Sequence, residues 1–125
     1  MSLCVLAGGK VATIAATLFT LSWTHSVEKI RWEEDWRVTP AGLEITEARV
    51  QGSGAGMEPP PEARFNNGWW SYKPVLGPLP ELNLAASGAT GEGWRLCTRG
   101  AGRAENQCMT LGAQKEAPVI LKPCD

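Results

Sequence analysis

The sequence has little of what several well-defined classes of function require. It contains one histidine in 125 residues, so a metal site built on two histidine ligands is excluded. None of its four cysteines is spaced as Cys-x-x-Cys, so a zinc site has little support. Lysine and arginine are scattered and the formal net charge is −1, which leaves no basic patch for a nucleic acid. We therefore predict no metal, no cofactor and no nucleic-acid partner.

Long apolar segments are also missing. The longest apolar run, Val11 to Trp23, is interrupted by threonines and is shorter than the roughly 20 residues that cross a bilayer as a helix. Lys10 followed by this run has the order of a secretory signal, but Ser22 to His25 offers no small-residue cleavage site. We expect no direct membrane insertion. A cytoplasmic protein is the default expectation, and a periplasmic one is the alternative.

Motifs for phosphate binding and for nucleophilic catalysis are incomplete. The glycines of GSGAGM lack the last glycine of the dinucleotide fingerprint, and a triple proline follows instead of a helix. Ser53 lies in GSG rather than in a G-x-S-x-G elbow. An enzyme is therefore not the expected function.

The composition is that of a globular protein with many chain breakers. Hydrophobic residues make up 43% and charged residues 20%, which predicts a single domain over residues 1–125. With 14 Gly and 9 Pro, no stretch shows a helical stripe, and short strands between turns are the natural interpretation. We predict an all-β fold, an antiparallel β-sandwich or partly open β-barrel of roughly nine or ten short strands.

Glycine and proline define two connections in this fold. SLCVLA and KVATIA flank Gly8-Gly9, a pair that can take the positive φ angles of a tight hairpin turn. GSGAGMEPPPEARFNNG combines glycines with a triple proline, so we expect neither a regular strand nor a helix there. The sequence therefore predicts a long Gly/Pro-rich loop at 52–64.

Alternating side chains predict how the strands LFTLSWTH and IRWEEDWRV pair. Each strand has one mainly apolar face, and a tight turn at Val27-Glu28 would bring the two apolar faces together. In that register Phe19 lies opposite Trp36, Leu21 opposite Glu34, and Trp23 opposite Trp32.

Glu34 is the one charged residue on the apolar face of its strand. A simple turn at TPAG would set Glu34 opposite Glu47 with Arg49 beside them, and such a pair needs a shared guanidinium, proton, cation or ligand. The apolar positions of LEITEARV change parity near Thr46, which suggests a β-bulge. A bulge would turn Glu47 outward and leave Ala48 opposite Glu34. Both arrangements stay open at this point.

His25 lies where the apolar face ends. Its nearest candidate partners are Glu28 and the loop that contains Gly54 and Gly56, and a carboxylate neighbour would favour the protonated imidazole. A histidine that only caps a turn is the simpler interpretation.

The four cysteines, Cys4, Cys97, Cys108 and Cys124, permit three pairings if they are oxidised. Cys97 and Cys108 flank a glycine-rich connection between two apolar runs, so a cross-strand disulfide is possible. In the cytoplasm, free buried cysteines are favoured.

Several segments together resemble a known family. LSWTHSVEKIRWEEDW, GSGAGMEPPPE, GWW, WRLC and VILKPC are similar to segments of the small bacterial proteins of unknown function encoded beside TRAP transporters of the TAXI type, over nearly the whole chain. The most specific elements are 25–28 and 54–57. The resemblance implies a role accessory to solute uptake, with a transporter component or a small organic solute as partner, and it carries over no catalytic residue. Some relatives carry an N-terminal membrane anchor that is not expected here, which leaves the compartment open.

We therefore predict a binding or interaction module accessory to a TRAP-type solute transporter. One alternative is a small enzyme that uses Glu34 with Glu47 or His25 for proton transfer. Another is a structural protein in which the cluster is an ion network within the sheet. The predicted ligand or partner site consists of His25, Ser26, Glu28, Glu34, Glu47, Arg49, Gly54, Gly56 and Met57.

Overall fold

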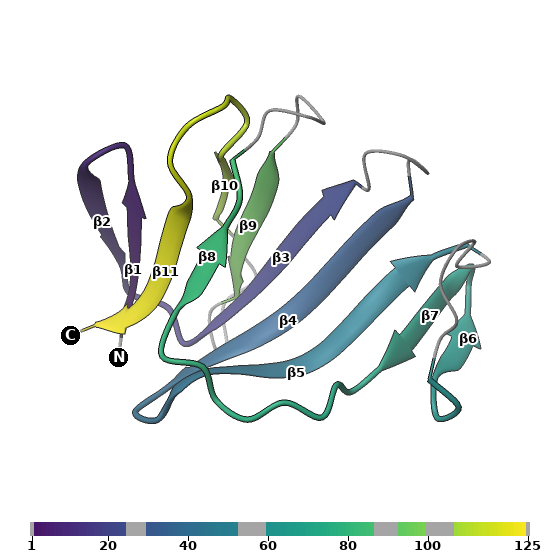
Figure 1. Cartoon of the computed structure of the whole chain (residues 1–125). Coiled ribbons are helices and arrows are strands. Elements are labelled where there is room, and N and C mark those ends of the chain that lie inside the picture. The colour runs from purple at the N-terminus through teal and green to yellow at the C-terminus, as the bar shows by residue number, and fades with distance from the viewer. Residues whose placement is uncertain (1, 25–29, 53–59, 87–92, 100–106, 125) are drawn as a thin grey trace.

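The protein is built from two antiparallel β-sheets (Figure 1). The computed structural model describes residues 2–24, 30–52, 60–86, 93–99 and 107–124. These residues form eleven strands and no helix, so the predicted all-β class is confirmed. The strands are β1 (Ser2–Ala7), β2 (Lys10–Ile14), β3 (Leu18–Thr24), β4 (Arg31–Thr39), β5 (Gly42–Gln51), β6 (Arg64–Asn66), β7 (Trp69–Tyr72), β8 (Leu82–Leu84), β9 (Trp94–Arg99), β10 (Cys108–Leu111) and β11 (Val119–Cys124).

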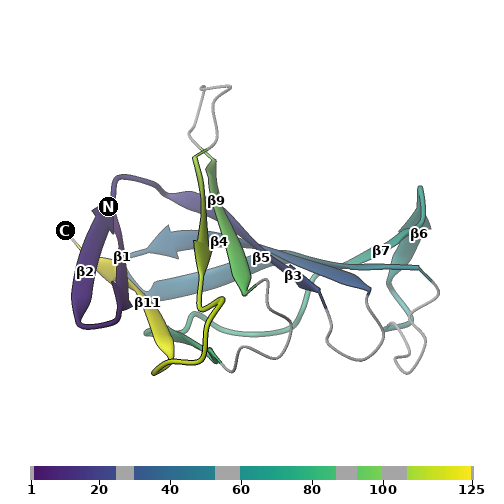
Figure 2. The same cartoon turned by 90° about the horizontal axis from the view of Figure 1, so that it is seen from above.

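The smaller sheet has the strand order β2-β1-β11-β8, and the larger sheet has the order β10-β9-β3-β4-β5-β7-β6. The smaller sheet lies at one end of the larger one, while β6 and β7 lie at the opposite end (Figures 1 and 2). The run Val11 to Trp23 contributes to β2 and β3. Within the described residues, no helix is long and apolar enough to cross a membrane.

The hydrophobic core lies between the sheets. Alternate residues of each strand face inward because successive side chains of a strand point to opposite faces. Each large apolar side chain that becomes fully buried contributes about 1.5–3 kcal/mol. The fully buried core side chains include Leu3, Val119 and Leu121 from the smaller sheet and Phe19, Leu21, Leu43 and Leu96 from the larger one.

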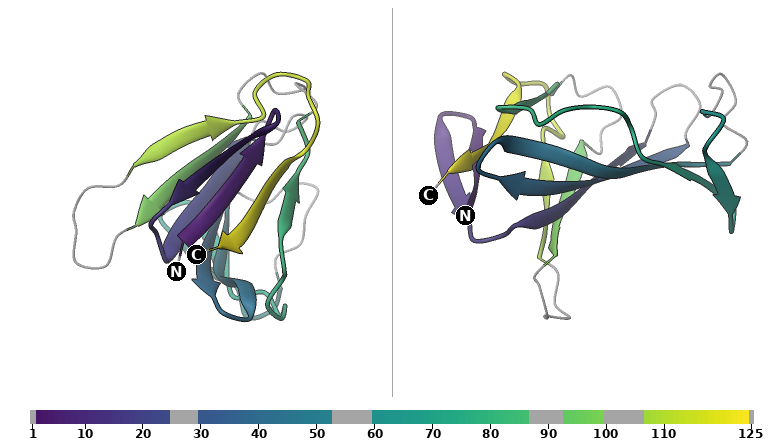
Figure 3. Two further views of the ribbon diagram at one scale, coloured as in Figure 1. Left: turned by 90° about the vertical axis from the view of Figure 1, so that its left-hand side faces the viewer. Right: turned by 90° about the horizontal axis from the view of Figure 1, so that it is seen from below.

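Two predicted turns are confirmed. Gly8 and Gly9 have φ angles of 57° and 77° and join β1 to β2 as an antiparallel hairpin. The TPAG turn joins β4 to β5, and Gly42 there has a φ angle of 133°. A side chain at Gly42 would also collide with the backbone of Leu79, which exchanges two hydrogen bonds with Leu43. These bonds tie the segment between β7 and β8 to β5, and Figure 3 shows that segment passing along the sheet.

The middle of the chain departs from the prediction in one respect. Arg64–Asn66, expected to be irregular, forms β6 and pairs with β7. The turn that makes this possible contains Asn67 and Gly68, with φ angles of 52° and 83°. Such angles suit a tight hairpin, so the Asn-Gly pair was the overlooked signal. Residues 53–59 of the predicted loop lie outside the described residues.

The predicted pairing of β3 with β4 is confirmed. Trp23 lies opposite Trp32 and stacks on it with ring centroids 6.1 Å apart. Trp94 of β9 extends this aromatic row on the other side of Trp23, at 4.8 Å. Phe19 lies opposite Trp36, as predicted, and Leu21 lies opposite Glu34.

The expectation of free cysteines is wrong, because the structure contains two disulfides. Cys97 of β9 bonds to Cys108 of β10, the cross-strand pair that the sequence allowed. Cys4 of β1 bonds to Cys124 of β11. The second pair was not predicted because local patterns do not show that the first and last strands are neighbours.

The two disulfides should differ in their effect on stability. Cys4 and Cys124 are 120 residues apart and Cys97 and Cys108 only 11. A cross-link that closes a longer loop removes more entropy from the unfolded chain, which corresponds to about 5 against about 3 kcal/mol. Urea denaturation should therefore show a larger loss of unfolding free energy for Cys4→Ser/Cys124→Ser than for Cys97→Ser/Cys108→Ser. The reverse order would contradict this account.

Candidate functional site

An extra residue in β5 decides on which face of the larger sheet the predicted charged residues lie. Trp36 pairs with Ile45, whereas Glu34 pairs with Ala48, so β5 has one residue more than β4 over this stretch. The extra residue makes a β-bulge near Thr46. The bulged register is therefore confirmed, because Glu34 lies opposite Ala48 and Glu47 lies opposite Asp35 on the other face.

Glu34 lies on the inner, apolar face. Its Oε1 atom accepts a hydrogen bond from Nε1 of Trp36 at 3.2 Å. Burial raises the pKa of Glu34, and the hydrogen bond from Trp36 offsets this only in part. The pKa of Tyr72 is also raised. Burial of Tyr72 is the larger cause, and the negative charge of Glu34 is the smaller one. Glu34 is thus a carboxyl group in a poorly solvated setting.

Arg49 lies on the outer face and does not bond to Glu34, although a shared guanidinium was one of the alternatives that the sequence left open. Its NH1 and NH2 groups donate to Oδ2 and Oδ1 of Asp35 at 2.8 and 3.0 Å. Its Nε group donates to Glu33 at 3.0 Å, and NH1 also donates to Glu47 at 2.8 Å. The bulge is the physical reason, because it turns Glu47 and Arg49 outward together.

The bonds between Arg49 and Asp35 favour the charged form of both residues. Hydrogen bonds to Asp35 raise the pKa of Arg49 above its ordinary range, despite the opposing effect of burial. Burial alone would raise the pKa of Asp35. Hydrogen bonds from Arg49 and Thr20, with the charges of Arg49 and Arg99, instead hold that pKa below its usual value. The guanidinium already has three carboxylate partners, which suits an ion network within the sheet better than a ligand site.

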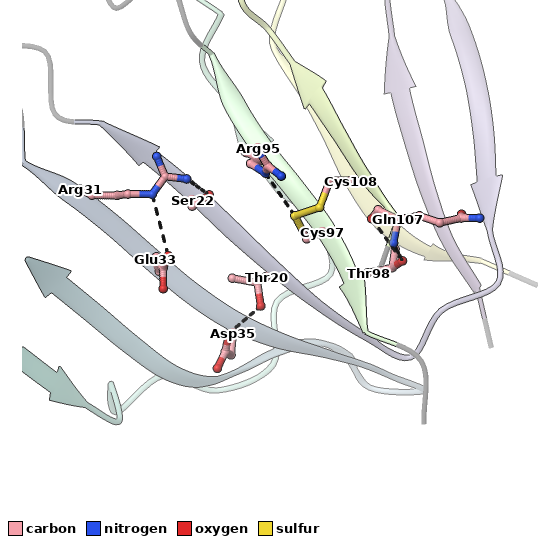
Figure 4. Close-up of a disulfide and its surroundings, with 10 residues drawn as sticks. All are labelled: Thr20, Ser22, Arg31, Glu33, Asp35, Arg95, Cys97, Thr98, Gln107 and Cys108. Carbon is pink, nitrogen blue, oxygen red and sulfur yellow. Dashed lines mark hydrogen bonds and ion pairs between the residues drawn. A yellow bond between two sulfur atoms is a disulfide. The ribbon is translucent and has the colours of Figure 1, made fainter. Parts of the chain in front are cut away.

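A second group of polar residues surrounds a cleft of about 290 Å³ at the end of β3, β4, β9 and β10. We call it the arginine cleft. Its guanidinium groups come from Arg31 and Arg95, on either side of β3 (Figure 4). Three hydroxyl residues, Ser22, Thr24 and Thr110, line it together with Trp23 and Gly93.

Register explains why these residues meet. Ser22 lies opposite Arg95 on β9, and Arg95 lies opposite Thr110 on β10. Thr24 lies opposite Arg31 on β4. All five residues therefore share the outer face of neighbouring strands.

The described residues that line the arginine cleft carry two positive charges and no negative one. Arg31 donates to Oγ of Ser22 at 3.0 Å, and its Nε lies 3.9 Å from a Glu33 carboxylate that is also bonded to Arg49. Arg95 donates to Sγ of Cys97 at 3.4 Å, a weak acceptor (Figure 4). Among the described residues, Arg95 has no carboxylate partner. The described residues thus supply the cleft with two guanidinium groups and one shared, distant carboxylate.

The comparisons with known proteins give a family but no function. Residues 19–104 match DUF1850, a domain of unknown function. The chain belongs to this family. The match extends from β3 past β9, so it includes six of the seven strands of the larger sheet, all except β10. No curated protein and no solved structure matches the chain. No finding connects the DUF1850 match with TRAP transporters.

Several predicted site residues cannot be placed. His25, Ser26, Glu28, Gly54, Gly56 and Met57 lie outside the residues that the structure describes. Within the described residues, no group of three His, Cys, Asp or Glu side chains could hold a metal ion.

Sequence reasoning missed Asp35, Arg31 and Arg95 as members of charged clusters. Arg31 and Asp35 alternate with the tryptophans of β4, so the same pattern that predicted the inner face also defined an outer one. Arg95 had no such signal because its place depends on the pairing of β3 with β9, which are distant in sequence.

Removing Arg49 should destabilise this DUF1850 domain. Arg49→Met would leave Asp35, which is only 8% exposed, without its main cationic partner. Breaking a largely buried ion pair in this way costs about 3 kcal/mol. Urea denaturation at neutral pH measures the loss. Arg37→Met is the matched control, because it breaks the more exposed Arg37–Glu44 pair between the same strands and should cost under about 1 kcal/mol. Equal losses would contradict the network's role.

Glu34 should make stability depend on pH. Because its folded-state pKa is raised above 4.5, the folded protein binds more protons than the unfolded chain just above that pH. The wild type should therefore lose stability, relative to Glu34→Gln, as the pH rises from 4.5 through the folded-state pKa. Glutamine keeps an acceptor for Trp36 but does not titrate. Thermal melts across this range test the difference, and parallel curves for the two proteins would refute it.

Proposed function

We propose that this DUF1850 protein is a binding module for a small anionic solute, which it holds in the arginine cleft. The observation that carries the proposal is the convergence of Arg31 and Arg95 on one cleft with three hydroxyl groups. Arg49 is bonded to close carboxylates, whereas neither Arg31 nor Arg95 forms a close ion pair with a carboxylate among the described residues.

The chemistry of the cleft favours an oxyanion. A guanidinium presents its N–H groups as a planar fork that matches a carboxylate or a phosphate. The hydroxyl groups of Ser22, Thr24 and Thr110 can donate to the remaining lone pairs of such a ligand. Ser22 is buried and accepts a hydrogen bond from Arg31, so part of the cleft is already organised before a ligand arrives.

The position of Glu34 weighs against the enzyme alternative. Its side chain lies on the inner face of β4, whereas the arginine cleft is built mainly from outer-face residues. A proton-transfer group has to lie within hydrogen-bonding reach of the reacting group. Binding without chemistry is therefore the better-supported proposal.

Because the chain resembles proteins encoded beside TRAP transporters, we propose that it binds its ligand as part of solute uptake. A module accessory to solute uptake would hold the solute, or a carboxylate side chain of a transporter component, through the same two arginines. The cleft's preference for anions supports either partner.

A thermal-shift screen with small carboxylates and inorganic phosphate tests the proposal. A ligand that binds only the folded protein raises its melting temperature. We expect at least one oxyanion to do so for the wild type and to lose the effect in Arg95→Gln and Arg31→Gln. Arg64→Gln is the matched control, since Arg64 is an exposed arginine on β6, at the other edge of the same sheet. If no oxyanion shifts the wild type, or Arg95→Gln responds like the wild type, the proposal is wrong.

A further inference from the structure

A second cleft, of about 590 Å³, adjoins the arginine cleft. It lies between the turn of the β1–β2 hairpin and the chain that follows β10, and we call it the hairpin cleft. Lys10, Gln114 and Glu116 supply its charged and amide groups, and Ala7, Leu111 and Ala113 are among its apolar lining. Lys10, Gln114 and Glu116 are exposed, so their polar groups are accessible to a ligand.

The two clefts share a wall. Thr110 lines both of them. Gly93 of the arginine cleft lies directly against the backbone that lines the hairpin cleft, because a Cβ added to Gly93 would come within 2.5 Å of the Leu111 carbonyl oxygen and 2.7 Å of the Ala113 nitrogen. The Cys97–Cys108 disulfide holds β10, and therefore Thr110, against β9. Thr110, where the two clefts meet, is thus held in place by backbone packing and a covalent bond.

The polar groups of the hairpin cleft differ in kind from those of the arginine cleft. Lys10 and Glu116 carry opposite charges, so the cleft has no net preference for a second charged group. The ammonium of Lys10 donates, the carboxylate of Glu116 accepts, and the amide of Gln114 does both. A hydroxyl group carries no charge and also donates and accepts, so one hydroxyl can bond to any member of this set. The apolar lining suits the carbon chain that carries them.

We infer that the ligand is a hydroxylated carboxylic acid whose carboxylate binds Arg31 and Arg95 and whose hydroxyl-bearing chain passes Thr110 into the hairpin cleft. This inference rests on the proposed function, since it assumes that the arginine cleft binds the acidic end. Beyond the proposed function, the inference specifies that the part of the ligand outside the arginine cleft is a hydroxylated chain. It also names the hairpin-cleft residues that would bind this chain.

Calorimetric titration with three probes tests the inference. Gluconate carries a carboxylate and a hydroxylated chain, hexanoate has a chain of the same carbon number without hydroxyl groups, and acetate has the carboxylate alone. The dissociation constant of gluconate should be at least about ten times lower than that of hexanoate or acetate. Only gluconate has hydroxyl groups that can form hydrogen bonds in the hairpin cleft, and each such bond strengthens its binding. Gln114→Ala/Glu116→Ala should remove that advantage and leave acetate binding unchanged.

Lys115→Ala serves as the matched control, because Lys115 is an exposed neighbour that does not line the cleft. If the three acids bind equally and Arg95→Gln abolishes their binding, the inference is overturned while the proposed function stands. If gluconate keeps its advantage in Gln114→Ala/Glu116→Ala, the hairpin cleft is not the site of recognition. If none of the three binds, the inference is overturned, and the phosphate and carboxylate screen decides whether the proposed function fails with it.

Discussion

The paired hydrogen bonds between Arg49 and Asp35 are the interaction on which the arrangement of the larger sheet depends. They form only because β5 contains one residue more than β4 at the bulge. Without that residue Arg49 would share the inner face with Trp32 and Glu34, where two carboxylates would oppose each other. A single insertion therefore moves a cation and a carboxylate out of the apolar layer and leaves Glu34 as the charged residue of β4 within it.

This division gives the two faces of the larger sheet different roles. The inner face packs against the smaller sheet through its apolar side chains, among them the stacked rings of Phe19 and Trp36. The outer face carries charge, but not uniformly. Around Arg49 each charge has a close partner of opposite sign, whereas Arg31 and Arg95 face a cleft to which the described residues contribute one distant carboxylate. Because the guanidinium of Arg49 already bonds to three carboxylates, whereas Arg31 and Arg95 have no close carboxylate among the described residues, we place the proposed ligand at the second cluster.

Local patterns in the sequence predicted much of this fold. Alternation placed Phe19, Leu21 and Trp23 opposite their partners on β4, and the change of parity near Thr46 indicated the bulge. These features are local, since they depend on neighbouring strands joined by short turns.

The features that the sequence did not predict are non-local. The Cys4–Cys124 disulfide depends on the first and last strands lying together, and the arginine cleft depends on β9 returning beside β3. No local periodicity encodes either pairing. The predicted site residues Glu34, Glu47 and Arg49 divide between two faces of the sheet, with Glu34 on the inner face and the other two on the outer face.

The claim that the arginine cleft binds an oxyanion is tested most directly by nuclear magnetic resonance of the arginine Nε–H groups during a titration with acetate. The account predicts saturable shifts for Arg31 and Arg95, with the resonances of Arg64 and Arg49 unchanged. Arg64 lies at the far edge of the sheet, and Arg49 is already bonded to three carboxylates. Equal small shifts of all arginines, or none at Arg31 and Arg95, would contradict the claim.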